Sequence, residues 1–261
     1  MNKILTSLVS GAILTSSLCA DFARIEMGAG SLVQTPVGSV TTTDDSNFLS
    51  LDGTYTTNGD ESAQMYAWML VKHPVPIIPN LRVEYLSITD AGNFTYKMEG
   101  VSSPTTEGVS SPTTVDMKQF DIIPYYNLLD NTFWVTVDAG IDIKVIQADI
   151  NIQAIDAYML DPMVPSYLSS DTVAIPLLYL RGRVQIPTTN IGLESDVKYI
   201  SDGDNTVYDI RAKVDYTFDI FPIIQPAFEL GYRIQKFDID TDETVGALEY
   251  SGVYAGMMIR F

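Results

Sequence analysis

The last nine residues of the chain alternate strictly between two kinds of side chain. One set is apolar and the other holds the only charge: Val253, Ala255, Met257, Ile259 and Phe261 against Tyr254, Gly256, Met258 and Arg260. Because successive side chains of a β-strand point to opposite faces, this spacing predicts a strand with one wholly apolar face. Nine residues are about the length that a tilted strand needs to cross a lipid bilayer. The chain is therefore predicted to end in a membrane-crossing strand that finishes on an aromatic residue.

The same period of two recurs along most of the chain. It is clearest between Val207 and Phe218, where aromatic and aliphatic side chains alternate with Asp209, Arg211 and Lys213. Strands are expected near 22–33, 62–73, 80–89, 115–128, 132–146, 173–185, 191–200, 207–218, 224–237 and 247–261. Repeated alternation of this length predicts an all-β fold. The even number of strands is typical of a closed antiparallel up-and-down transmembrane β-barrel, here of about ten strands, with eight or twelve as alternatives.

The predicted connections alternate between short and long. Short turns are expected at 74–79, 129–131, 186–190 and 219–223, and long loops at 34–61, 90–114 and 147–172, with shorter acidic loops at 201–206 and 238–246. Bacterial membrane barrels have short turns on the periplasmic side and long loops on the outside. This pattern predicts that both chain ends are periplasmic and that the long loops are external.

One predicted loop contains a near-exact tandem repeat. Residues 100–107 read GVSSPTTE and residues 108–115 read GVSSPTTV. Segments rich in Ser, Thr, Pro and Gly cannot bury a core, so a flexible external loop is expected at 100–115. A binding epitope is the alternative, and the composition favours simple length variation.

The amino end is predicted to be removed. Residues 1–20 have a basic start, a mostly apolar run and a small residue before Asp21, which is typical of a cleaved secretory signal peptide. The barrel is then expected to occupy 21–261. Cys19 is the only cysteine, so the mature chain has no disulfide or thiol chemistry. The formal net charge of −18 makes nucleic acid and anionic surfaces poor partners.

The charged face of the predicted strands holds as many acidic as basic residues, although the whole chain is strongly acidic. These residues are Arg24, Glu26, Arg82, Glu84, Asp121, Asp138, Asp142, Lys144, Arg181, Arg183, Glu194, Asp196, Lys198, Asp209, Arg211, Lys213, Asp215, Glu229, Arg233 and Arg260. A solvated outer face has no need for such a balance, whereas a confined interior does, because unpaired charge there is costly. The balance favours a narrow or plugged lumen, to which Trp134 and Tyr179 are also assigned.

No catalytic or metal-binding arrangement stands out. The single histidine, His73, lies at a strand end beside a proline-rich turn, where a structural role is expected, and no Ser–His or Cys–His pair can be built. The acidic segments 202–205 and 238–243 lack the spacing of a calcium loop. Aromatic residues near strand ends suit interfacial girdles: Tyr125, Tyr126, Phe133, Phe218, Phe221 and Phe261. We therefore predict a non-enzyme without metal or cofactor.

Four segments carry a family resemblance: 73–76 (HPVP), 125–131 (YYNLLDN), 231–233 (GYR) and 254–261 (YAGMMIRF). They are similar to a functionally uncharacterised family of small proteobacterial outer-membrane β-barrel proteins. The aromatic end also resembles the signal that such barrels present to their assembly machinery, here Val253, Ala255, Met257, Ile259 and Phe261. The resemblance implies the outer membrane of a Gram-negative bacterium, with lipid, lipopolysaccharide and the barrel assembly machinery as partners. It supplies no catalytic residues, and the ligand, if there is one, stays open.

Three functions are compatible with these observations. The first is a structural barrel or narrow channel, with cation preference expected from its acidic loops. The second is a surface binding protein or adhesin that acts through its long loops. The third is a soluble periplasmic barrel that carries an apolar ligand inside.

Overall fold

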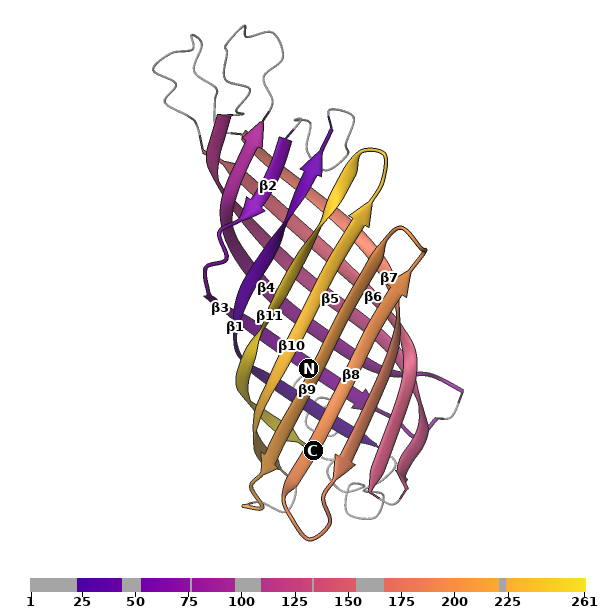
Figure 1. Cartoon of the computed structure of the whole chain (residues 1–261). Helices are drawn as coiled ribbons and strands as arrows, with labels where there is room; N and C mark the ends of the chain where they lie inside the picture. Colours follow the sequence, from indigo (N-terminus) through magenta and orange to yellow (C-terminus); the bar gives the residue numbers. More distant parts are fainter. Residues whose placement is uncertain are drawn as a thin grey trace, which may run out of the picture.

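The computed structural model describes residues 23–43, 53–75, 77–96, 109–132, 134–153, 167–220 and 224–261. Every regular element in these ranges is a β-strand (Figure 1). The strands are β1 (Arg24–Thr42), β2 (Gly53–Thr57), β3 (Ser62–Lys72), β4 (Asn80–Tyr96), β5 (Val109–Thr132), β6 (Val135–Ile152), β7 (Tyr167–Gln185), β8 (Ile191–Ser201), β9 (Thr206–Thr217), β10 (Gln225–Asp240) and β11 (Thr244–Arg260). The predicted all-β class is confirmed, whereas the signal peptide prediction lies outside the described residues.

The strands form one closed sheet in which chain neighbours pair antiparallel. β1 pairs with β11 along its whole length, so the sheet has no free edge there. β2 and β3 both lie between β1 and β4. β2 pairs with the end of β1 and the end of β4, and β3 pairs with the first part of each of these two strands. Counting β2 and β3 as one interrupted strand gives ten strand positions, and the predicted ten-stranded up-and-down barrel is confirmed.

The seam between β1 and β11 joins the two ends of the chain. Its register runs from Glu26 opposite Arg260 to Thr42 opposite Thr244. Gly30 and Gly256 face each other across this seam. A Cβ on Gly256 would lie 2.3 Å from the hydroxyl of Tyr66, so only glycine leaves room for that ring inside the barrel. We call the end of the barrel where β1 begins and β11 finishes the proximal end, and the opposite end the distal end.

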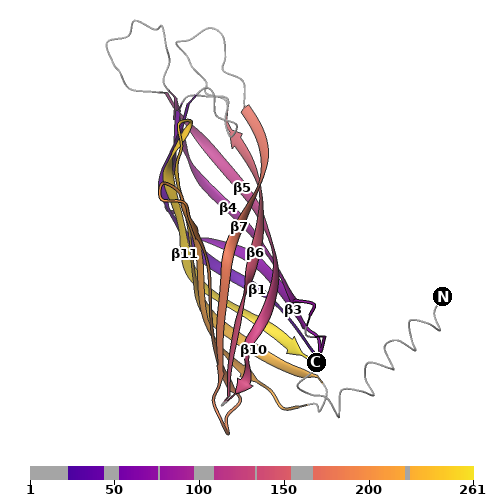
Figure 2. The same ribbon diagram turned by 90° about the vertical axis from the view of Figure 1, so that its right-hand side faces the viewer.

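The strands near the distal end are longer than the sequence predicted. β1 runs to Thr42 instead of residue 33, β4 runs to Tyr96 instead of residue 89, and β6 runs to Ile152 instead of residue 146. β5 and β7 start at Val109 and Tyr167 instead of residues 115 and 173. Much of the three predicted long loops is therefore strand, and β2 was not predicted at all. The barrel is accordingly tall and narrow (Figure 2).

The tandem repeat shows the same difference. Most of its second copy forms the start of β5, where Val109 to Val115 pair with Tyr96 to Asp90 of β4. Its first copy, 100–107, lies outside the described residues. The expectation of a loop across 100–115 was wrong for the second copy, because Thr and Val favour strands and because β4 supplies a partner for every one of these residues.

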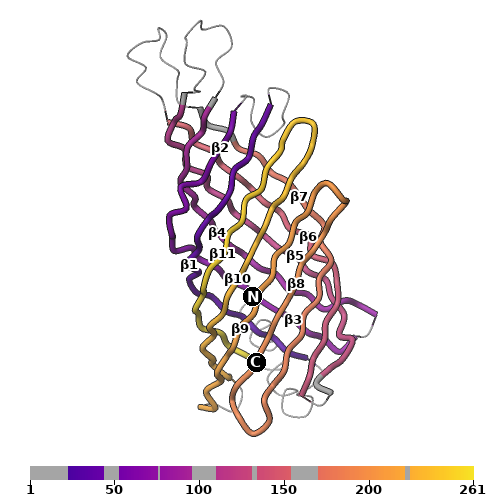
Figure 3. Tube along the Cα trace, in the orientation of Figure 1, coloured from indigo at the N-terminus to yellow at the C-terminus, as the bar shows by residue number. Residues whose placement is uncertain are grey.

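The outer face of the barrel changes character along its height. On β6 the outward residues are apolar from Val135 to Val145 and then polar at Gln147, Asp149 and Asn151. The same apolar belt continues around the proximal half at Ile25, Met27, Leu81, Phe120, Ile122, Ile141, Ile143, Leu178, Leu180, Ile210, Val214, Phe228, Leu230, Val253 and Met257, all of them exposed. Apart from the interruption between β2 and β3, the longer strands continue into the distal half, as the Cα trace in Figure 3 shows.

The height of the apolar belt follows from strand geometry. Eleven residues of a strand tilted by about 40° rise about 25–30 Å along a barrel axis. β5 has 24 residues, and a strand of that length rises about 60 Å at the same tilt. The apolar belt therefore covers about half of the barrel, and the distal half presents mainly polar side chains on its outside, with Val37 and Val245 among the exposed apolar residues there. None of the described residues forms a helix that is long and apolar enough to span a membrane.

Candidate functional site

The interior of the proximal half is filled with charged side chains. The structure places all the charged residues that were assigned to the lumen on the inner face, and all but one of them are buried. The exception is Arg24, whose side chain is 34% exposed at the proximal end, where its Nε lies 2.9 Å from Glu26. We call this set the ionic plug. It draws on β1 and on every strand from β4 to β11.

Two lysines occupy the centre of the ionic plug. The Nζ of Lys144 donates to Asp121 at 2.7 Å and to Asp209 at 3.1 Å. The Nζ of Lys198 donates to Glu84 at 2.8 Å and also to Asp121. These contacts join β4, β5, β6, β8 and β9 across the barrel axis. The lysines therefore link strands that are not neighbours in the sheet.

Arginines surround this centre and pair with carboxylates in a forked geometry. Arg233 donates from Nε and Nη2 to the two oxygens of Asp209, at 2.9 and 2.7 Å. Arg181 bridges Asp138 and Glu194, both at 2.6 Å. Bidentate guanidinium–carboxylate pairs, such as that of Arg233 with Asp209, are the strongest and most directional ion pairs in proteins. The plug is thus a connected network and not a set of separate pairs.

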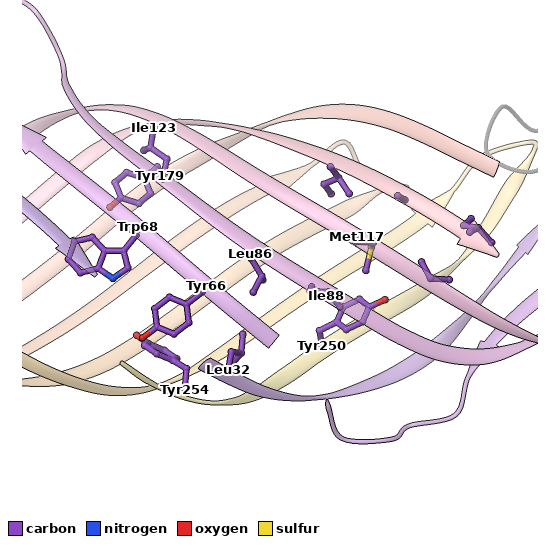
Figure 4. Close-up of a cluster of buried hydrophobic side chains, with 14 of the residues drawn as sticks. Leu32, Tyr66, Trp68, Leu86, Ile88, Met117, Ile123, Tyr179, Tyr250 and Tyr254 are labelled. Carbon is purple, nitrogen blue, oxygen red and sulfur yellow. The ribbon is translucent and has the colours of Figure 1, made fainter. Parts of the chain in front are cut away.

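The β3 side of the plug is aromatic. The hydroxyl of Tyr66 and the indole N–H of Trp68 both donate to Glu229, at 2.7 and 3.1 Å. Figure 4 shows these rings beside Tyr254, whose ring meets that of Tyr66 edge-on at 5.2 Å. The ammonium of Lys213 lies 4.4 Å from the centre of the Trp68 ring, which adds a cation–π contact.

The central side chains of the plug are out of contact with water. Arg82, Lys144 and Lys198 are 0% exposed although each carries a charge. Lumen side chains of an open pore are in contact with water, so they would retain exposed surface. The interior of the proximal half is consequently packed like a protein core around these residues.

The interior of the distal half has the opposite character. Above a hydrogen bond of 2.9 Å between Gln119 and Gln235, the inward residues become apolar, and a cavity of about 300 Å³ lies among them. Its wall includes Tyr55, Phe94, Val115, Met117, Ile146, Ala148, Ile150, Ile175, Phe237 and Leu248. We call this space the distal cavity. At this level of the barrel the interior therefore changes from charged to apolar, and the outer face changes from apolar to mainly polar.

One buried acid, Asp90 of β4, lies next to the wall of the distal cavity. Its two oxygens accept hydrogen bonds from the hydroxyls of Tyr55 and Thr57, both at 2.9 Å. Burial raises the pKa of Asp90 above its ordinary value of 3.8, and these two hydrogen bonds oppose that change. Asp90 thus serves to anchor β2 to β4.

His73 and the acidic loops hold turns together. His73 accepts a hydrogen bond at Nδ1 from the backbone N–H of Val75, at 3.1 Å, and its Nε2 lies 3.0 Å from the carbonyl of Pro79. Asp202 accepts from the backbone N–H of Asn205 at 2.8 Å, and such contacts keep the pKa of Asp202 below 3.8. Across the described ranges no group of three or more His, Cys, Asp or Glu residues is placed to hold a metal ion.

Some residues lie where the sequence did not place them. Trp134 occupies the turn between β5 and β6 and is 54% exposed, so its assignment to the lumen was wrong. Tyr125 points inward and is buried, so it belongs to no girdle, whereas Tyr126, Phe218 and Phe261 are exposed. The other two girdle candidates, Phe133 and Phe221, are outside the described residues.

The C-terminal pattern lies on the outer face as the period of two requires. Val253, Met257 and Phe261 are exposed, and Ala255 and Ile259 are half-buried. Sequence reasoning missed the distal cavity altogether. The available signal was the apolar run of alternate residues Ile146, Ala148, Ile150 and Ile152, which share a face with Asp142 and Lys144.

Comparisons with known proteins agree with this fold. No family model and no curated sequence matches the chain. In structure the chain is similar to the outer membrane protease OmpT from Escherichia coli, with a TM-score of 0.54 and 11% identity over 92% of this chain and 97% of that one. The translocator domain of the autotransporter NalP from Neisseria meningitidis gives a TM-score of 0.43 and 10% identity, with 98% of each chain covered.

At these identities the similarity to OmpT shows the fold alone. The class that the geometry defines is a closed, antiparallel β-barrel of the kind found among Gram-negative outer-membrane proteins. The finer resemblance to a small proteobacterial family stays a prediction.

Proposed function

We propose that this protein is an integral outer-membrane β-barrel whose membrane-spanning part is a closed structural element, without catalysis and without an open channel. The observation that carries the proposal is the ionic plug, whose central Arg82, Lys144 and Lys198 have no exposed surface. In the proposed placement, the apolar belt lies in the hydrocarbon core of the bilayer and the plug lies at the same level.

The apolar belt supports the membrane placement. Its height of about 25–30 Å agrees with the apolar band of transmembrane barrels, which is about 25 Å tall. A soluble barrel with these residues would expose apolar surface around its whole circumference, which soluble monomers avoid. The soluble periplasmic carrier is therefore the weakest of the three hypotheses.

The contacts of the titratable groups support a non-catalytic role. The carboxylates of the plug are paired with Arg or Lys and shielded from solvent, so they lack the access to substrate that a general acid or base needs. His73 is engaged in its turn at both ring nitrogens.

Electrical recording tests the closed state. Refolded wild-type protein in planar bilayers is expected to give no steady conductance. A variant that replaces the lumen residues Arg82 and Glu194 by Ser keeps the charge balance, opens space in the plug and is expected to conduct in steps. The matched control replaces Lys236 and Asp238 by Ser, an outward pair whose charged atoms are 2.6 Å apart. This control should show no conductance. Steady conductance of the wild-type barrel contradicts the proposal and favours the narrow channel.

A second candidate function is binding at the cell surface. The observation in its favour is the distal half, where the strands continue beyond the apolar belt and carry polar side chains outside, such as Asn93, Asp116 and Asn151. In the proposed orientation this half stands clear of the bilayer. A rigid scaffold of this kind is suited to present a site to the medium.

A further inference from the structure

The distal cavity is a built space, separate from the ionic plug. Its walls come from strands on all sides of the barrel, including β2, β5, β6 and β10. Most of the wall side chains are apolar, and the polar ones are Thr42, Tyr55, Asp171, Thr241, Glu243 and Thr244. Phe94 and Ile150 are buried, with 0% and 4% of their surface exposed. The cavity extends to the distal ends of β1 and β11, at Thr42 and Thr244. A pocket with these features is the common form of a small-molecule site.

The size of the cavity limits its ligand. An apolar cavity of about 150 Å³ in a protein core holds one benzene molecule. The distal cavity has about 300 Å³, which is about twice that space and corresponds to roughly ten to twelve carbon atoms. Its apolar wall offers few polar partners, so water gains little there and a hydrocarbon group gains more.

The charge at the rim limits the ligand further. The acidic residues that line the cavity are Asp171 and Glu243, and among the described lining residues there is no Lys or Arg. An anionic head group would therefore meet carboxylates, with no cation in the described part of the wall to pair with, which disfavours it. The nearest buried acid, Asp90, already has both oxygens engaged by Tyr55 and Thr57.

We propose that the distal cavity is a binding site for one small, uncharged apolar molecule of about ten carbon atoms, and that the acidic rim selects against carboxylates of the same size. This site lies wholly in the distal half of the barrel. It is independent of whether the ionic plug conducts ions, so binding and conductance can fail separately.

Methyl NMR of methionine provides a local readout. Met117 lines the cavity, whereas Met257 is 65% exposed on the apolar belt and reports partition into lipid. With [methyl-¹³C]methionine protein in lipid nanodiscs, 1-decanol is expected to shift the Met117 signal in a saturable manner and the Met257 signal only in proportion to concentration. Decanoate at neutral pH should bind at least about tenfold more weakly at the Met117 signal.

Two variants separate the cavity from the lipid. Ala148→Trp fills the cavity and is expected to weaken the decanol response at Met117 by about tenfold or more. The matched control is Gln147→Trp, one residue away on the outer face, which should bind like wild type. Heat-modifiable migration on gels verifies that both variants are folded.

Charge reversal at the acidic rim tests its role in selecting against carboxylates. Asp171→Lys combined with Glu243→Lys places cations at the mouth and is expected to reduce the preference for decanol over decanoate to less than about threefold. The inference is overturned if Ala148→Trp binds decanol like wild type, or if wild-type protein binds decanoate as tightly as decanol.

Discussion

Lys198 illustrates how single residues hold the barrel closed. Its ammonium lies within 4 Å of four carboxylates, those of Glu84, Asp121, Asp142 and Asp209, and the side chain is fully buried. Removal of one partner from a buried ionic network leaves the other charges without compensation. The stabilising effect of the plug therefore depends on its completeness more than on the strength of any one pair.

A substitution at this residue tests that dependence. Lys198→Met keeps the volume of the side chain and removes its charge, and it should lower the free energy of unfolding by about 3–5 kcal/mol. The control Lys236→Met breaks the outward pair with Asp238, whose side chains are 30% and 40% exposed, and should cost at most about 1 kcal/mol. Denaturant unfolding followed by tryptophan fluorescence measures both. Equal effects of the two variants would contradict a connected plug.

Asp90 carries a pH-dependent effect in the distal half. Since burial raises its pKa above 3.8, the folded state binds the proton more tightly than the unfolded state does. Its contribution to the free energy of unfolding is therefore largest below pH 3.8 and falls as the pH rises through the folded-state value. Asp90→Asn does not titrate, so the stability of wild type minus that of the variant should decrease across this window. Denaturant titrations at stepped pH check the sign, and a rise in this difference contradicts it.

At the scale of the strand, β6 shows one sequence serving two environments. Its inward face is charged at Asp142 and Lys144 and becomes apolar from Ile146, while its outward face changes from Ile143 to Asn151. Both faces switch within a few residues, and the pairing with β7 keeps one register throughout. The switch therefore arises from side-chain choice alone and not from a bulge.

A pair of outward substitutions on β6 locates the boundary. Ile141→Arg places a charge near the middle of the apolar belt and should destabilise the barrel by about 2–4 kcal/mol in lipid vesicles. Asn151→Arg lies on the same face beyond the belt and should change the free energy of unfolding by no more than about 0.5 kcal/mol. Unfolding of both variants in vesicles gives the comparison. A similar cost at the two positions would show that the belt extends to the distal end.

This switch also explains what could be predicted from the sequence. The boundaries of β8 and β9 agree with prediction to within one residue, because each of these strands lies almost wholly in the proximal half. The ends of β1 and β5 were missed, because their distal parts are rich in Thr, Ser, Pro and Gly. The charged interior could be predicted because one face of the strands carries equal numbers of acidic and basic residues. The apolar run of β6 marks only one wall of the distal cavity, and the cavity itself depends on which faces of distant strands meet.

The whole molecule combines a closed proximal half with a hollow distal half. The proximal half has apolar side chains outside and ions inside, as a section placed in lipid requires when its interior is packed. The distal half has polar side chains outside and an apolar interior, the arrangement of a water-soluble barrel that encloses a ligand. We infer that the membrane anchors the first half and that the second half projects from it.

This division predicts how the protein is oriented in a cell. Since Cys19 is the only native cysteine and lies in the predicted signal peptide, single cysteines can be introduced at Asn151, Ile143 and Asp219. A membrane-impermeant maleimide added to intact cells is expected to label Asn151→Cys in the distal half, but neither Ile143→Cys in the belt nor Asp219→Cys in the proximal turn between β9 and β10. Denatured samples of all three variants should label equally. Labelling at Asp219→Cys in intact cells, with Asn151→Cys protected, would reverse the orientation and place the distal cavity in the periplasm, where its ligand would come from inside the cell envelope.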